Sequence, residues 1–71
     1  MEKLIKCPLP GKLVEYTVKR GEQVSKGDVV AIVESMKMLN EICSEEDGVV
    51  TRLIAFPDSF VEANGNLLGI E

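Results

Sequence analysis

Residues 29–43, VVAIVESMKMLNEIC, decide the fold of this chain. The run 29–33 is apolar and mostly β-branched, which is typical of a strand with at least one fully buried face. Residues 39–43 alternate between apolar and polar side chains, as a half-buried strand does. Two strands joined so closely form a hairpin, and we expect Lys37 at its tip, offered to solvent between two methionines.

The chain has 71 residues, and we expect a single small domain over residues 1–71. Such a domain buries about 60% of its unfolded surface, so its core is thin. Six glycines, three prolines and abundant branched aliphatic residues favour short strands with tight turns. No window has a sustained apolar stripe at helical spacing, so we predict essentially no α-helix.

The formal net charge is −4, from eight basic and twelve acidic residues. This balance argues against a nucleic-acid or anionic-membrane partner, for which a basic surface is expected. No apolar run approaches the roughly 18 residues of a membrane span, and the first residues do not resemble a signal peptide. We therefore expect a cytoplasmic protein that binds neither membrane nor nucleic acid.

The two cysteines, Cys7 and Cys43, are expected to be buried reduced thiols rather than a disulfide, because no secretory signal is recognised. A metal site is not expected, since the chain has no histidine and no CxxC pair.

The first half of the chain divides into short strands separated by glycine and proline turns. The expected strands are residues 3–7, 12–18, 23–24, 29–33 and 39–43. A shift of 37 positions then relates this half to the second one. The shift carries Gly11 to Gly48, Gly21 to Asp58, Val24 to Val61, Gly27 to Asn64, Val33 to Ile70 and Glu34 to Glu71. Asn and Asp tolerate left-handed backbone, so turn chemistry is kept in both copies.

Two copies of one unit suggest a pseudo-two-fold domain whose halves share a core. Eight short strands must close on one another to hide their edges. We therefore predict an all-β fold of two four-stranded antiparallel sheets packed face to face, a flattened barrel or sandwich (a barrel-sandwich hybrid). The symmetry places the lysine hairpin at one end and the chain termini near the other.

Met36 and Met38 are unusual companions for a turn lysine. Asn-Gly or Asp-Gly is the common choice at a hairpin tip, and methionine is a poor turn former. Methionine often fills gaps in cores, but strand alternation cannot bury both of these beside Lys37. At least one is expected to lie partly exposed, as an adaptable apolar recognition surface around the lysine.

The stretch Glu34-Ser35-Met36-Lys37-Met38 carries a family resemblance, together with Pro10-Gly11 upstream and Gly21-Glu22-x-Val24-x-x-Gly27 between them. It resembles the biotin carboxyl carrier (biotinyl) domain of the biotin/lipoyl attachment family, over residues 3–71. The related lipoyl domain usually has Asp-Lys-Ala at the tip, so this sequence is more similar to the biotinyl type.

The resemblance implies that Lys37 is covalently biotinylated by a biotin protein ligase, with Met36 and Met38 as flanking recognition residues. It further implies that the biotin shuttles a carboxyl group between a biotin carboxylase and a carboxyltransferase or decarboxylase. Residues 56–60, Phe-Pro-Asp-Ser-Phe, depart from the family, which often has Gly-Asp there. We expect this apolar loop to pack against the domain rather than to touch a partner.

No catalytic constellation is present, because the chain has no histidine and no distinctive pair of carboxylates. The sequence therefore predicts a non-catalytic carrier. Two alternatives remain: a lipoyl-type swinging-arm carrier, distinguished by the ligase that modifies Lys37, and an unmodified interaction module, in which Lys37→Arg leaves function intact.

Overall fold

The computed structural model describes residues 1–71 and consists of eight β-strands joined by turns. The strands are β1 (Lys3–Lys6), β2 (Gly11–Tyr16), β3 (Gln23–Val24), β4 (Val29–Ser35), β5 (Met38–Cys43), β6 (Gly48–Leu53), β7 (Phe60–Val61) and β8 (Asn66–Ile70). The strands predicted in the first half are all present. No helix in the structure has the length and apolar character needed to cross a membrane.

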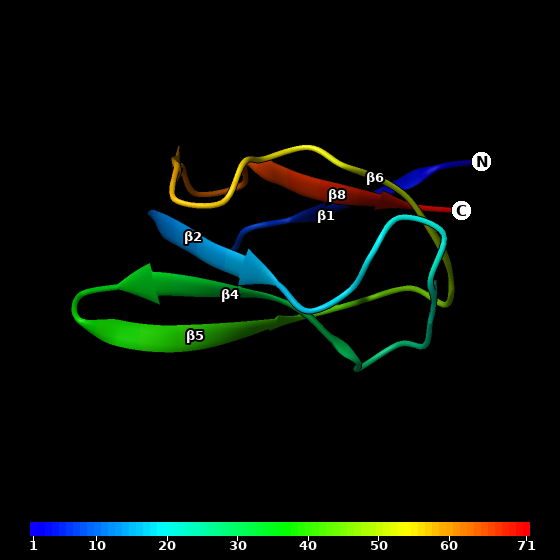
Figure 1. The fold of residues 1–71 in the computed structure, drawn as a ribbon, viewed down its shortest axis with the longest axis horizontal. Helices are drawn as coiled ribbons and strands as arrows, with labels where there is room; N and C mark the ends of the chain where they lie inside the picture. The colour runs from blue at the N-terminus through cyan, green and yellow to red at the C-terminus, as the bar shows by residue number, and fades with distance from the viewer.

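The strands form two four-stranded sheets, with orders β1-β8-β6-β3 and β5-β4-β2-β7. Every pairing is antiparallel. The two sheets lie one above the other in Figure 1, with the β4–β5 hairpin reaching beyond the rest at one end. The predicted all-β architecture of two antiparallel four-stranded sheets is confirmed.

A single apolar core lies between the sheets and receives side chains from both of them. Its members are Ile5, Cys7, Leu13, Val18, Val24, Val30, Ala31, Val33, Ile42, Val50, Val61, Leu67, Leu68 and Ile70. Most are β-branched or leucine, which suits the alternate inward positions of short strands. The core is therefore shared by the two halves of the sequence.

The internal repeat is confirmed in the backbone. The 37-residue shift carries β2, β3 and β4 onto β6, β7 and β8, and β1 onto β5, so one sheet order maps onto the other. Gly21 and its partner Asp58 have φ values of 90° and 71°. Gly27 and its partner Asn64 have φ values of 97° and 66°. The residue types at these four turns follow from their left-handed backbone.

Gly11 and Gly48 are equivalent for a different reason, the close approach of a neighbouring strand. A Cβ on Gly11 would clash with the carbonyl oxygen of Glu34. A Cβ on Gly48 would lie 2.7 Å from the carbonyl oxygen of Glu71. The 37-residue shift relates Glu34 to Glu71. In each half, a glycine therefore allows the close approach of an equivalent pair of strands, β2 and β4 in one half and β6 and β8 in the other.

Two of the predicted strands end earlier than expected, whereas the two strands of the hairpin extend further, to Ser35 and from Met38. The first strand stops at Lys6, since Cys7 bonds to the turn at Gly65 and not to β8 (N–O 2.8 Å). The strand predicted over residues 12–18 stops at Tyr16, which pairs with Ala31, although the backbone N–H of Thr17 still donates to the carbonyl oxygen of Val30 at 3.0 Å. Val18 nevertheless packs into the core from the following loop.

Two burial predictions are wrong. Both cysteines are free thiols, but Cys43 is exposed while Cys7 is buried. Ile42 takes the inward position on β5, and alternation turns Cys43 outward. Phe56 and Phe60 are also exposed rather than packed, because Ala55 and Val61 supply the inward side chains of that segment.

Candidate functional site

The Lys37 hairpin has the tightest common connection between two strands. Strands β4 and β5 pair from Val29–Cys43 to Ser35–Met38, which leaves a loop of two residues. These residues, Met36 and Lys37, have φ values of 54° and 64°. Positive φ at both positions defines a type I′ turn, whose twist matches that of the flanking strands.

Neither loop residue suits this backbone. Type I′ turns favour Asn-Gly because left-handed backbone costs other residues about 1–2 kcal/mol each. The cost is sustained here because β4 lies inside the sheet, between β5 and β2, and holds the hairpin along its length. Strained, non-optimal residues at a protruding turn indicate a role other than stability.

Asn40 ties the base of the hairpin together, and sequence reasoning did not single it out. Its side-chain amide donates to the carbonyl oxygens of Val33 and Met38, both at 3.2 Å. These bonds link β4 to the first residue after the turn. The sequence signal that could identify Asn40 is a polar residue at an inward position of a strand, because buried polar groups are hydrogen-bonded.

The side chains at the tip are exposed to solvent. Lys37 is exposed and belongs to none of the ion pairs in the structure. Met36 is 92% exposed and Met38 is 66% exposed, so both flank the lysine as apolar surface. The structure thus brings the three predicted site residues together at one point, with an ammonium group that no neighbouring carboxylate holds.

The tip lies far from the chain termini. Figure 1 shows the hairpin at one end of the long axis and both termini at the other. The molecule extends 32 Å along this axis. The amino terminus is 3.9 Å from the Oε2 atom of Glu71, so the two ends of the chain lie together. The predicted separation of tip and termini is confirmed.

The chemistry open to this tip is that of an acyl acceptor. A primary amine on a rigid, projecting turn can enter another enzyme's active site and be acylated there.

Comparison with known proteins identifies a family whose model matches this chain. A family model described as "Biotin-requiring enzyme" matches residues 3–70. The acetyl-CoA carboxylase of Schizosaccharomyces pombe is 44% identical over 66 residues, which is 93% of this chain and 3% of that protein. The gamma subunit of methylmalonyl-CoA decarboxylase from Veillonella parvula is 45% identical over 47 residues, 66% of this chain and 36% of the subunit. The chain thus spans a small part of each relative.

A solved structure, that of the urea carboxylase from Kluyveromyces lactis, superposes on the whole chain with a TM-score of 0.93. The sequence identity is 24%, and the match covers 6% of that protein. This likeness establishes the fold.

Proposed function

Because the chain belongs to the family of biotin-requiring enzymes, we propose that it is a biotin carboxyl carrier with biotin bound covalently to Lys37. The observation that carries this proposal is the tip itself, an exposed lysine between two exposed methionines on a strained two-residue turn. The carboxylase and decarboxylase relatives support biotin over lipoate as the attached group.

Attachment is an acyl transfer from an activated mixed anhydride, biotinyl-adenylate, in the active site of a biotin protein ligase. The Nζ atom of Lys37 attacks the acyl carbon, an amide bond forms, the bond to adenylate breaks, and the amine loses a proton. The exposed Lys37 side chain fits this reaction, because the ligase must enclose the amine and finds no ion pair to break.

The bound cofactor supplies the chemistry, and the protein supplies attachment and reach. Its role is to carry a carboxyl group from a biotin carboxylase to a carboxyltransferase or decarboxylase. The flexible arm gives a high effective concentration at both enzymes without tight docking. In this role the domain is non-catalytic, and its location in the cytosol stays a prediction.

The decisive experiment is the intact mass of the protein after co-expression with a biotin protein ligase, beside Lys37→Arg. We expect the wild type to gain one biotinyl group and Lys37→Arg to gain none while keeping its melting temperature. A folded wild type without added mass contradicts biotin attachment. The same pair incubated with a lipoate ligase then tests a lipoyl carrier, and no modification by either enzyme indicates an interaction module.

A further inference from the structure

Apart from the terminal Met1, the most exposed large apolar side chains gather at the hairpin end. They are Met36, Met38, Leu39, Phe56 and Phe60, with exposed fractions between 66% and 92%. Exposed apolar residues on the other sheet, Leu4, Val49 and Leu53, are only 37% to 41% exposed. Concentration of apolar surface at one end of a small protein marks a contact site.

The internal repeat indicates that this loop backbone does not depend on the two phenylalanines. Phe56 and Phe60 correspond to Lys19 and Gln23 in the first half. The backbone around them is the same. Gly21 N bonds to Val50 O at 2.7 Å, and the equivalent bond, from Asp58 N to Leu13 O, is also 2.7 Å. One loop is therefore built with polar residues and its copy with aromatic residues, and the aromatic copy lies at the Lys37 end (Figure 1).

Phe60 and Leu39 lie on one face of the hairpin sheet. Register pairs Phe60 with Lys12, Lys12 with Glu34, and Glu34 with Leu39, so all four side chains share the outer face. The next row of this face pairs Glu15 with Ile32 and Ile32 with Glu41.

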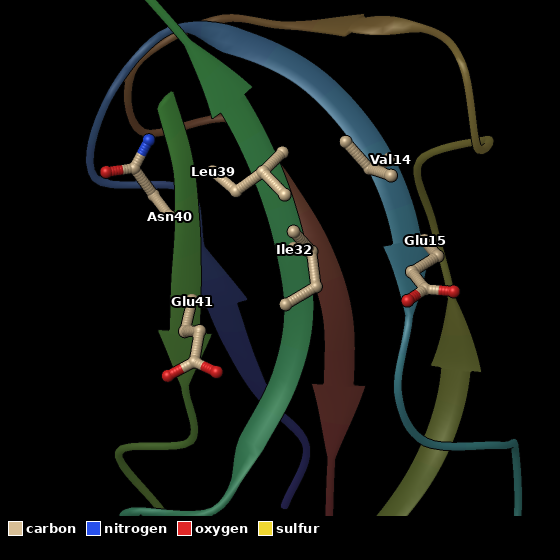
Figure 2. Close-up of a pocket in the computed structure, with 6 residues that line it drawn as sticks. All are labelled: Val14, Glu15, Ile32, Leu39, Asn40 and Glu41. Carbon is tan, nitrogen blue, oxygen red and sulfur yellow. The ribbon is translucent and has the colours of Figure 1, made fainter. Parts of the chain in front are cut away.

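A shallow depression occupies this outer face (Figure 2). It is lined by Val14, Glu15, Ile32, Leu39, Asn40 and Glu41. Ile32 forms its floor, and Figure 2 shows Leu39 and Val14 on either side of it. The hollow starts two residues from Lys37 and runs down the flank of the hairpin.

Two carboxylates of this outer face have no cationic partner. Glu15 and Glu41 flank Ile32 from the strands on either side, roughly 10 Å apart at two strand spacings. Neither carboxylate takes part in an ion pair. The one cation of the neighbouring row, Lys12, is paired with Asp58 at 3.8 Å. A positive group placed over Ile32 would face both carboxylates at once.

We propose, on the basis of the proposed function, that this outer face is the docking surface for the ligase that acylates Lys37. The ligase surface that fits it carries a lysine or arginine set among apolar side chains. The cation lies between Glu15 and Glu41, and the apolar groups cover Ile32, Leu39 and Phe60. The carboxylates steer and orient the complex, while the apolar side chains provide its contact area.

Geometry favours the ligase over the enzymes that act later. The ligase reacts with the Nζ atom of Lys37 itself, so it must close around the hairpin and its flank. Enzymes that use the loaded arm reach a group at the far end of a long tether, and their surfaces can stay further from Leu39. A face that begins two residues from Lys37 is thus covered most completely during acylation.

The test is the steady-state kinetics of biotin transfer to the full chain by a biotin protein ligase. Phe60→Gln copies the equivalent Gln23, and Glu15→Arg copies the equivalent Arg52, so both variants use residues that the repeat already accommodates. We expect each to raise the KM for the protein about tenfold, a loss of ~1.4 kcal/mol in binding, with kcat unchanged. The effect of Glu15→Arg is expected to shrink as salt is added.

Glu45→Lys is the matched charge control, because Glu45 is exposed in the turn beyond β5 and belongs to no ion pair. It is expected to match the wild type. A kcat/KM within twofold of this control for both face variants overturns the proposal, provided that their melting temperatures are unchanged. Normal acylation with slower carboxylation of the loaded variants by a biotin carboxylase also overturns it. A wild type that is never biotinylated contradicts the proposed function instead.

Discussion

At the scale of single residues, the tip combines unfavourable backbone with unfavourable exposure. Met36 and Lys37 adopt positive φ, and Met36 leaves almost its whole side chain in water. Each feature costs stability, and neither is repaid by a contact within the domain. A hairpin selected for folding alone would have Asn-Gly at these positions. The residues therefore serve whatever binds the tip.

Replacing Met36 by asparagine separates stability from recognition. Met36→Asn is expected to raise the free energy of unfolding by about 1 kcal/mol, because asparagine tolerates left-handed backbone. It is also expected to slow biotin transfer to Lys37, because an apolar contact of the ligase is lost. Urea denaturation and transfer kinetics measure the two effects. Met36→Leu is the companion variant, which keeps the apolar surface but not the sulfur. Transfer at the wild-type rate in Met36→Asn would contradict a recognition role for Met36.

At the scale of elements, the repeat explains which predictions succeed. The strands of the first half could be predicted from turn glycines and β-branched runs, because these residues depend directly on backbone conformation. Burial was harder to predict, since it depends on which face of a short strand turns inward. The repeat holds this information. Cys43 corresponds to Lys6, and Phe60 corresponds to Gln23, both exposed positions.

Cys7 shows the same relation in the core. Its equivalent is Ser44, which is also buried. Cys7 Sγ donates to the carbonyl oxygen of Leu9 at 2.9 Å, and Ser44 Oγ donates to that of Glu46 at 2.6 Å. Comparison of the two halves residue by residue thus predicts which cysteine is buried. The register bulges also recur in both halves, between Leu13 and Glu15 and between Val50 and Arg52. The hollow beside the hairpin follows from tertiary packing and leaves no such pattern.

Gly27 tests the turn geometry that the repeat predicts. Its φ of 97° is unfavourable for any β-branched residue, although a Cβ there would meet no atom within 4 Å. We expect Gly27→Val to destabilise the domain by about 1–3 kcal/mol through backbone strain alone. Gly27→Asn is the matched control, because Asn64 occupies the equivalent turn. Thermal denaturation compares them, and an unchanged melting temperature for Gly27→Val would contradict the strain argument.

At the scale of the whole molecule, the two sheets are joined by one polar group that breaks the symmetry. The hydroxyl of Tyr16, on β2, lies 2.8 Å from the carbonyl oxygen of Ala55 and 2.7 Å from that of Leu67. Its equivalent in the repeat is Leu53, which cannot make such bonds. The tyrosine thus ties the sheet that bears Lys37 to the sheet that bears the termini, and the hairpin is held at one end of a rigid body.

Tyr16→Phe measures this link, and its pH dependence has a definite sign. Loss of the hydroxyl leaves the carbonyl of Ala55 without a partner, so we expect a loss of about 1–2 kcal/mol in the free energy of unfolding at neutral pH. Burial raises the pKa of Tyr16 above its ordinary value of 10.0. The unfolded chain therefore releases this proton first. The stabilising contribution is complete below pH 10.0 and declines as the pH rises through the folded pKa.

The wild type is accordingly expected to lose stability more steeply than Tyr16→Phe above pH 10.0, and the two curves should converge. Because Tyr16 is the only tyrosine, tyrosinate absorbance titrates this one group in the folded and in the urea-unfolded chain. Lysine titration is common to both proteins and cancels in the comparison. Parallel stability curves, or the same tyrosinate pKa in both states, would show that the hydroxyl is not held between the sheets.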